Sequence, residues 1–340
     1  MLDTRPEQRR DAAVVVGLGA CLPPRAVTNA ELSTELDTSD AWIVSRTGIR
    51  QRHVVDPGTA TGDLATEAGA RALKSAGVDS VDFVVLATAT PDRPCPATAP
   101  EVASRLGMTG TPAFDLSAVC TGFVYGLATA AGLLSTGAAR RVLLIGADTF
   151  STIVHPDDRS SRVVFGDGAG AVVLRAGDAR EPGALGPMDL GSDGTLGELI
   201  MIPDGGSRSR SGDPAARELG YFTMHGRSVF RAAVERMTAS SRAVLERRGW
   251  TPGDVDCLVP HQANARITDA VGERLGIPPE RRVSNVERVG NTAAASIPLA
   301  LADAVARGAL RAGARVLLTA FGGGATWGST AVVWPDIVVQ

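Results

Sequence analysis

VDFVV at residues 81–85 returns as VDCLV at residues 255–259, and this pair of stretches decides the fold. RVLL at residues 141–144 is repeated as RVLL at residues 315–318, and in both pairs the two copies are 174 positions apart. Each run is rich in apolar residues suited to strands and follows a segment with helical periodicity. Two repeats at one separation indicate that the chain contains two copies of a single α/β unit.

The two copies also end alike, on GAGAVVL at residues 168–174 and on GSTAVVW at residues 328–334. Short, continuous apolar runs are typical of strands that helices bury on both faces. Helical patterns lie between these runs, at residues 61–76, 122–135, 228–248, 264–275 and 293–307. The sequence therefore predicts an α/β protein in which a duplicated unit forms a layered α-β-α-β-α arrangement, with helices between two related sheets.

The junction between the copies is expected at GDAREPGALG, residues 177–186, where residues that break helices and strands gather. We accordingly predict an N-terminal extension at residues 1–11, a first half at 12–180 and a second half at 181–340. A further loop at residues 204–220 is rich in Gly, Ser and Arg. Its length indicates either a functional lid or a mobile surface segment.

The composition indicates an ordinary soluble globular protein. Of its 340 residues, 44% are hydrophobic and 21% are charged, with a formal net charge of -3, so no general attraction to nucleic acid is expected. No apolar stretch reaches the roughly 18 residues of a membrane span. The four cysteines are far apart and fit neither a disulfide framework nor a metal site, which favours a reducing, cytoplasmic location.

Cys120 is the candidate nucleophile. It follows a short strand pattern and small residues, and an uncharged helical pattern begins directly after it. At a helix N-terminus, free N–H groups and the helix dipole favour the thiolate form. The alternative is a buried structural cysteine, because free cysteines are commonly found in protein cores.

Three elements of the second half complete this candidate site. His261 follows the apolar run at 257–260, where the carboxyl end of a strand is a common place for ligands, and imidazole is suited to proton transfer near neutral pH. Asn291 lies where another helix begins, and its alternative role is a plain N-cap. Gly322, Gly323 and Gly324 follow the strand pattern at 315–320, so the backbone there can approach a ligand closely. Neither this run nor GDGAG at 166–170 has the lysine and hydroxyl residue of a phosphate-binding loop.

Together and in this order, these elements resemble the β-ketoacyl-acyl carrier protein synthase III family of the thiolase superfamily. The resemblance extends from about residue 14 to residue 334. Its most specific motifs are DTSDAWIVSRTGIRQRH at 37–53, FGDGAGA at 165–171, VPHQAN at 259–264, GNTAAAS at 290–296 and FGGGATWGS at 321–329. The resemblance implies a thiolase-like fold.

The resemblance also implies a reaction. Cys120 would take an acyl group from acyl-CoA, and malonyl-acyl carrier protein would lose carbon dioxide and attack the resulting thioester. The products would be CoA and a 3-oxoacyl-acyl carrier protein. The 3-oxoacyl-acyl carrier protein would prime fatty acid or polyketide synthesis. His261 and Asn291 would bind the malonyl thioester oxygen, and the N–H groups of Cys120 and Gly323 would form the oxyanion hole. CoA thioesters are substrates here, no metal or redox cofactor is needed, and a homodimer is implied.

Further residues take roles by the same resemblance. Trp42 and Arg159 would sandwich the CoA adenine, although Trp42 could instead be a helix residue packed on the core. The pantetheine tunnel would be lined by Thr38, Arg46, Phe230 and Asn264. Arg231 and Arg266 would contact the carrier protein, while Glu273 replaces a lysine common in the family. The acyl pocket would be bordered by Ile200, by Phe321 and by Cys95 from the partner subunit. Cys95 replaces a bulky aromatic side chain, so we expect a starter larger than acetyl.

Four related kinds of protein are alternatives to a synthase III. A thiolase needs a second cysteine near the C-terminal glycine-rich loop, and none follows Cys257. A chalcone-synthase-like enzyme shares Cys, His and Asn, but the motifs around Trp42 and at residues 321–324 favour the synthase III group. A synthase-III-like acyltransferase that forms esters or amides usually alters the Asn, and a non-catalytic partner of a condensing subunit usually loses the nucleophile. Asn291 and Cys120 are both present.

Overall fold

The structure is a computed structural model that describes residues 12–212 and 220–339. The predicted N-terminal extension at 1–11 lies outside the described residues, as does part of the long loop at 204–220. Within the described residues, no helix is long and apolar enough to cross a membrane.

The first half builds a five-stranded sheet. Its order is β1 (Ala12–Cys21), β7 (Asp167–Gly177), β6 (Arg141–Thr149), β4 (Phe83–Ala87) and β5 (Ala113–Leu116). The pairs β4/β5 and β4/β6 are parallel, whereas β7 runs antiparallel to both of its neighbours. The apolar runs that stood out in the sequence are thus the centre of this sheet.

The second half repeats this order. Its sheet consists of β8 (Leu185–Ser192), β13 (Thr326–Val333), β12 (Arg315–Gly322) and β11 (Cys257–Pro260). The pair β11/β12 is parallel, as is β4/β6, and β13 is antiparallel to both neighbours. A parallel bridge from Leu258 to Arg282 takes the place that β5 has beside β4. The two sheets therefore share one topology, and the predicted duplicated, layered fold is confirmed.

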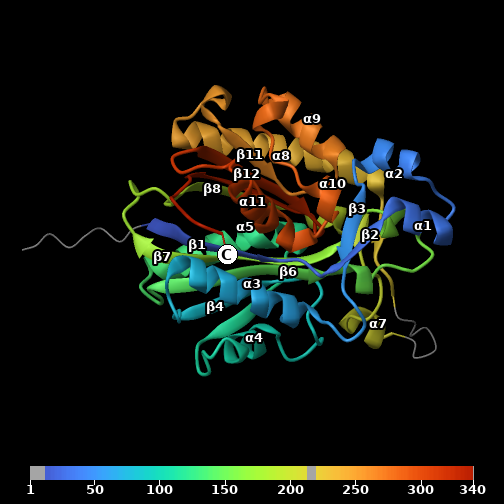
Figure 1. Ribbon diagram of the computed structural model, residues 1–340, viewed down its shortest axis with the longest axis horizontal. Coiled ribbons are helices and arrows are strands. Elements are labelled where there is room, and N and C mark those ends of the chain that lie inside the picture. The colour runs from blue at the N-terminus through green and yellow to red at the C-terminus, as the bar shows by residue number, and fades with distance from the viewer. Residues whose placement is uncertain (1–11, 213–219, 340) are drawn as a thin grey trace, which may run out of the picture.

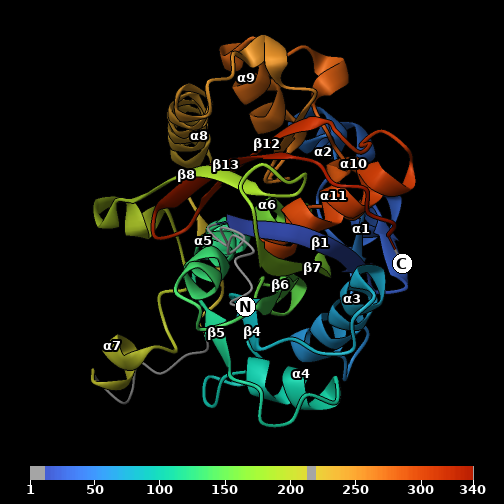
Figure 2. The same cartoon turned by 90° about the vertical axis from the view of Figure 1, so that its left-hand side faces the viewer.

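Helices form three layers around the two sheets, as Figure 2 shows. The helices of these layers are α3 (Thr61–Ala76) and α4 (Ala99–Arg105) outside the first sheet, α8 (Gly226–Arg248) and α9 (Ala265–Leu275) outside the second, and α5 (Gly122–Ser135) and α11 (Ser296–Ala306) between the sheets. The middle pair is almost free of charged residues because both of its sides face a sheet. The predicted limits 12–180 and 181–340 for the two halves stay a prediction.

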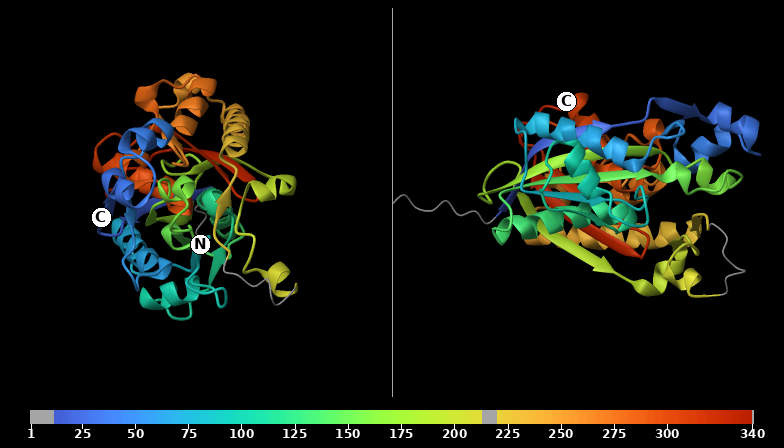
Figure 3. Two further views of the ribbon diagram at one scale, coloured as in Figure 1. Left: turned by 90° about the vertical axis from the view of Figure 1, so that its right-hand side faces the viewer. Right: turned by 90° about the horizontal axis from the view of Figure 1, so that it is seen from below.

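Shorter elements extend beyond the sheets at one end of the molecule (Figures 1 and 3). They are β2 (Arg25–Thr28), β3 (Gln51–Val54), α1 (Asn29–Glu35), α2 (Asp40–Thr47), α6 (Arg159–Arg162), α7 (Ser207–Arg210), β9 (Ile200–Met201), β10 (Thr223–Met224) and α10 (Val286–Val289). The carboxyl ends of β4, β6 and β11 point to this end of the molecule. Segments that follow these strands can therefore meet there.

One expected helix boundary is wrong. The pattern at 293–307 predicted a helix from Ala293, but α11 begins at Ser296 and the three residues before it form the 3-10 turn η7 (Ala293–Ala295). Ala293 has φ +45°, a left-handed conformation that a continuous α-helix cannot include. A similar 3-10 turn, η1 (Val119–Thr121), precedes α5, and Val119 has φ +46°. Neither residue type signals this conformation in a sequence.

Close packing between β1 and α3 requires a glycine at position 19. A Cβ atom there would overlap the carbonyl oxygen of Ala68 and the backbone nitrogen of Ala72, both in α3. Backbone atoms cannot move aside as a flexible side chain can. By contrast, a Cβ atom on Gly132, which lies within α5, would meet no atom within 4 Å.

We expect Gly19→Ala and Gly132→Ala to change stability in opposite directions. The first substitution forces α3 away from the sheet and should cost about 1–3 kcal/mol or more, whereas the second replaces a helical glycine and should gain about 0.5–1 kcal/mol. Denaturant titration of both variants measures the change. Equal stability of the two variants would contradict the packing described for β1 and α3.

Candidate active site

The three predicted catalytic residues line one pocket. Cys120 lies in η1 before α5, His261 follows β11, and Asn291 stands two residues before η7. The pocket encloses about 40 Å³ and is otherwise almost entirely apolar. Residues from both halves are thus brought together at the end of the molecule where the strands end.

Cys120 is buried, with 7% of its surface exposed. Burial raises the pKa of its thiol, and the nearby carboxyl group of Asp148 raises it further. Desolvation of the charged form thus opposes the thiolate that a helix N-terminus is expected to favour.

His261 is held as a neutral imidazole. Burial lowers its pKa to about 3, and its Nδ1 atom lies 2.6 Å from the Oγ atom of Ser296. That oxygen accepts the N–H of Gln262 at 3.3 Å, so the serine hydroxyl proton is free to point at Nδ1. With the imidazole proton on Nε2, Nδ1 accepts this hydroxyl proton, and Nε2–H is available to the pocket that His261 lines. Sequence reasoning missed Ser296.

The amide of Asn291 has a fixed orientation. Its Oδ1 atom accepts the backbone N–H of Ala293 at 3.0 Å, which leaves the NH₂ group to face the pocket. The main chain of Asn291 is also held on both sides, because its N–H donates to the carbonyl of Val164 and its carbonyl accepts the N–H of Gly166. The motif at 165–171 therefore positions this asparagine.

The glycine-rich loop approaches the nucleophile through its backbone. A Cβ atom at position 322 would lie only 2.9 Å from the backbone nitrogen atoms of Cys120 and Thr121. At position 323, a Cβ atom would lie 3.1 Å from a methyl group of Ile200. This loop can approach Cys120 because it has no side chains in the way.

None of the described residues expected to bind CoA lines this pocket. Trp42 is 36% exposed, and the guanidinium of Arg159 lies 5.2 Å from its ring centroid. A base can enter between them only if the pair separates. Arg46 is exposed nearby, and the Oγ1 atom of Thr38 is buried without a hydrogen-bond partner among the described residues.

The remaining expected contact residues lie in α8, in α9 or at the N-cap of α9. Asn264 caps α9 by accepting the N–H of Ile267 at 3.0 Å, so it has a structural role in this helix. Phe230 does not line the pocket of Cys120 but packs against Arg266, whose guanidinium lies 5.6 Å from its ring centroid. Arg231 is exposed on α8.

The expected acyl-pocket residues are only partly brought together within one chain. Ile200 and Phe321 line the pocket with Cys120, whereas Cys95 is exposed on the loop after β4 and does not line it. Sequence reasoning missed the aromatic cluster of Phe150, Phe165 and Phe222, whose ring centroids lie 4.3 to 5.0 Å apart. The other missed lining residues are Val119, Met224, Val229, Ala233, Met237, Ala263 and Ile267.

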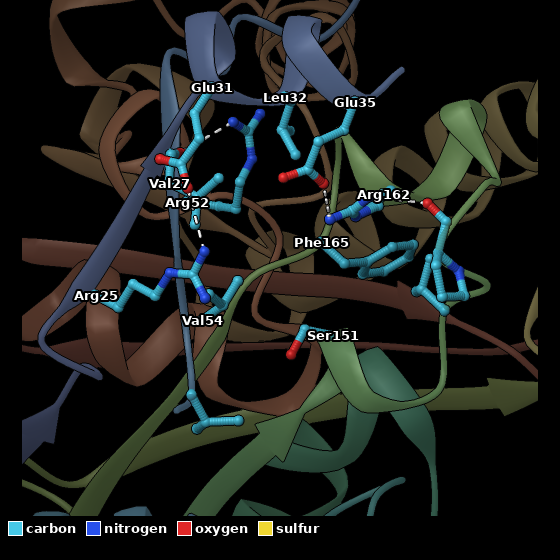
Figure 4. A pocket seen from close by; sticks show the side chains of 13 residues that line it. Arg25, Val27, Glu31, Leu32, Glu35, Arg52, Val54, Ser151, Arg162 and Phe165 are labelled. Carbon is cyan, nitrogen blue, oxygen red and sulfur yellow. Dashed lines mark hydrogen bonds and ion pairs between the residues drawn. The ribbon is translucent and has the colours of Figure 1, made fainter. Parts of the chain in front are cut away.

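A larger cavity of about 230 Å³ lies beside this site, between α1, β2, β3 and the segment at 151–165 (Figure 4). Its acidic and basic groups already pair with one another, Arg25 with Glu31 at 3.1 Å and Arg162 with Glu35 at 2.5 Å. The buried Arg52 binds only neutral oxygen atoms, among them the carbonyl of Val163 at 2.7 Å. Arg52 thereby joins β3 to the segment that holds Asn291, and the hydroxyl group of Ser151, which also lines the cavity, donates to Asp167.

Comparison with known proteins decides the family. Models of 3-oxoacyl-[acyl-carrier-protein (ACP)] synthase III match residues 114–194, and models of its C-terminal part match residues 245–334. The chain is 62% identical over 330 residues to beta-ketoacyl-[acyl-carrier-protein] synthase III 3 of Streptomyces coelicolor, covering 96% of this chain and 98% of that one. The chain belongs to the 3-oxoacyl-[acyl-carrier-protein] synthase III family.

Solved structures agree with this family. The synthase III of Pseudomonas aeruginosa PAO1 superposes with a TM-score of 0.91 at 56% identity, covering 96% of this chain and 99% of that one. The priming β-ketosynthase of the R1128 polyketide biosynthetic pathway has a TM-score of 0.89 at 36% identity, with 99% of each chain covered. As a synthase III, the protein is an acyltransferase of the condensing type.

We expect the imidazole of His261 to remain neutral between pH 5 and 8, with its proton on Nε2, because burial holds its pKa near 3. Ser296→Ala removes the donor to Nδ1 and should yield a mixture of the two neutral tautomers. Nitrogen-15 NMR of histidine-labelled protein reads both states, and His261→Ala assigns the signal. Titration of this signal near pH 6.5 would contradict the effect of burial on His261, and the same tautomer in wild type and Ser296→Ala would contradict the role given to Ser296.

Proposed function

We propose that this synthase III transfers an acyl group from acyl-CoA to the Sγ atom of Cys120 and condenses it with malonyl-acyl carrier protein, with loss of carbon dioxide. The observation that carries the proposal is the single pocket lined by Cys120, His261 and Asn291. A thiol for the acyl group and two neutral hydrogen-bond donors for a thioester oxygen suffice for this reaction.

The first step is transacylation. The thiol of Cys120 adds to the thioester carbonyl of acyl-CoA, and the oxygen that becomes negative is bound by the N–H groups of Cys120 and Gly323. The carbon–sulfur bond to CoA then breaks, and the thiol proton of Cys120 leaves with the CoA sulfur. Since burial raises the pKa of Cys120, proton loss and attack must be closely coupled.

The second step is decarboxylative condensation. The malonyl carboxylate leaves as carbon dioxide, and the electron pair of the broken carbon–carbon bond forms an enolate. The enolate oxygen accepts hydrogen bonds from Nε2–H of His261 and from the amide of Asn291. The enolate carbon attacks the acyl thioester, and the sulfur of Cys120 leaves and regains a proton. A neutral histidine suits this step because it donates a hydrogen bond while keeping its proton.

Residues outside this pocket account for the recognition of the two substrates. Trp42 and Arg159 hold the adenine, while Arg46 meets phosphate groups, which guanidinium groups bind well. Thr38, Phe230 and Asn264 line the path of pantetheine. Arg231 and Arg266, both exposed on adjacent helices, contact the acidic carrier protein.

The acyl pocket is completed in a cytoplasmic homodimer. Ile200 and Phe321 border it within one chain, and the exposed Cys95 is directed to the pocket of the partner subunit. Because a cysteine is smaller than an aromatic residue, the completed pocket accepts starters larger than acetyl. The expected starter size rests on Cys95, which replaces the bulky aromatic side chain of family members.

We expect substitutions to separate the two steps. Cys120→Ala should abolish loading, whereas His261→Ala and Asn291→Ala should load normally but condense roughly 10²–10³-fold more slowly, which is the usual cost of a lost donor to developing charge. Intact-protein mass spectrometry after incubation with acyl-CoA measures loading, and chromatography of the acyl carrier protein measures condensation. No adduct on Cys120 of the wild-type protein would exclude the covalent mechanism.

We expect steady-state rates to favour C4 to C8 and branched acyl-CoA over acetyl-CoA, with Cys95→Phe reversing this preference by filling the pocket. Cys21→Ala, at a partly buried cysteine of β1 that does not line the pocket, serves as the control and should leave the preference unchanged. A strong preference of the wild-type protein for acetyl-CoA would contradict the proposed starter size and leave the mechanism intact.

A further inference from the structure

The two halves contain the same unusual turn. Val119 and Ala293 have φ values of +46° and +45°, and no other non-glycine residue among the described ones has a positive φ. The two residues are 174 positions apart, the separation of the repeated strands. Each begins a 3-10 turn that leads directly into a central helix, α5 or α11. The turn therefore belongs to the duplicated unit.

The shared separation places the residues of the two turns in register. Cys120 corresponds to Ala294, and on the strand beside each turn Asp148 of β6 corresponds to Gly322 of β12. These two pairs differ in chemistry although their backbone is alike. One turn has a nucleophile and a neighbouring glycine, while the other has an alanine and a neighbouring carboxylate.

The turn at Ala294 holds a carboxylate oxygen. The N–H of Ala294 donates to Oδ2 of Asp148 at 2.9 Å. The other oxygen, Oδ1, accepts the N–H of Ala89 at 2.7 Å and the hydroxyl groups of Thr88 and Thr90 at 3.2 and 3.1 Å. Asp148 is fully buried, and all of these partners are neutral donors. This is how a protein binds an oxygen anion in a dry site.

The turn at Cys120 is open at the corresponding place. Gly322 has no side chain, and a Cβ atom there would lie 2.9 Å from the nitrogen atoms of Cys120 and Thr121. The N–H of Thr121 is already bound to the carbonyl of Ala118. Among the described residues, the N–H of Cys120 contacts no acceptor except its own sulfur. A substrate oxygen can therefore approach this N–H.

We propose that the turn at Ala294 is a second oxyanion site, built like the one at Cys120 and permanently occupied by the carboxylate of Asp148, and that Gly322 keeps the site at Cys120 open for substrate. The part that concerns Gly322 rests on the proposed function. The part that concerns Asp148 stands on the geometry of the turn. The ligand class of an emptied site at Ala294 is a small carboxylate.

Occupation of the second site has consequences for catalysis. The bond from Ala294 to Asp148 fixes η7, and this turn lies between Asn291, one proposed donor to the thioester oxygen, and Ser296, which contacts the other donor, His261. Asp148 also places a negative charge near the sulfur of Cys120. Asp148 is thus a positioning residue that also favours the protonated thiol.

Asp148→Gly tests the second site, because it gives this half the residue that the other half has. We expect this variant to have a lower melting temperature than the wild type. Formate should recover at least half of this loss in a saturable manner, because a ligand that binds only the folded state stabilises it. Chloride at equal ionic strength and the bulkier pivalate should not do so. Asp148→Asn is the matched control, because its amide still fills the site and formate should have no effect.

Absence of a formate effect specific to Asp148→Gly would overturn the second site. So would an equal effect of formate on Asp148→Asn or on the wild type. The melting temperature does not depend on acyl transfer, so this outcome is independent of the proposed function. If the wild type failed to load acyl groups while formate still rescued Asp148→Gly, the proposed function alone would fail.

A second readout separates the charge of Asp148 from its structural role. Asp148→Asn keeps the shape but removes the negative charge, so iodoacetamide should alkylate Cys120 faster at pH 7 than in the wild type. In Asp148→Gly, formate should slow this alkylation. Unchanged alkylation in Asp148→Asn would contradict the influence of this carboxylate on the nucleophile.

Gly322→Ala tests the open site. Its Cβ atom should close the approach to the N–H of Cys120 and slow loading by about 10²–10³-fold, the cost of one lost oxyanion donor. Acyl-CoA should still bind, as calorimetry measures, and an unchanged His261 signal in NMR shows that the site is otherwise intact. Loading within threefold of the wild-type rate would overturn the role of Gly322. If this variant does not fold, the formate experiment on Asp148→Gly still tests the second oxyanion site.

Discussion

The close approach of the turns that precede α5 and α11 is the constraint on which the site depends. A side-chain carbon at Gly122 would lie 3.1 Å from the Cβ atom of Ala87 and 3.4 Å from that of Ala294, and one at Gly146 would overlap the carbonyl oxygen of Ala294. Small residues from both halves therefore meet in the middle layer, where close packing leaves no free volume. Only this approach places Cys120 and Asn291, which belong to different halves, on the wall of one pocket.

Burial at this meeting point determines the kind of chemistry. Desolvation disfavours charge on both groups, because burial raises the pKa of the Cys120 thiol and lowers the pKa of the His261 imidazole. A charged acid or base is thus not offered to the substrate. The site offers hydrogen-bond donors in fixed positions, each held by another polar group, as Ser296 holds His261 and the N–H of Ala293 holds Asn291. Such donors stabilise charge that develops only during the reaction.

The sequence predicted the layered fold because both copies of the repeat keep their buried strands, and buried strands are visible as apolar runs. It also predicted that Cys120, His261 and Asn291 meet, since each follows a strand or begins a helix in a register that the repeat defines. It could not predict the turns at Val119 and Ala293, because positive φ at these residue types has no signature in a sequence. Ser296 looked like an ordinary helix residue, and the burial of Cys120 was not visible because it depends on segments distant in the chain, such as the one that carries Phe222.

The two turns show how a duplicated unit became asymmetric without a change in its backbone. The strained φ is retained in both copies, although strain of this kind costs of order 1–3 kcal/mol and persists only where the surroundings enforce it. In one copy the N–H of Ala294 donates to the carboxylate of Asp148. In the other copy Gly322 has no side chain, so a substrate oxygen can approach the N–H of Cys120. A carboxylate at both positions would close the site, and a glycine at both would leave η7, and with it Asn291, without its anchor. The asymmetry between Asp148 and Gly322 is therefore what allows one half to be rigid while the other half accepts the acyl group.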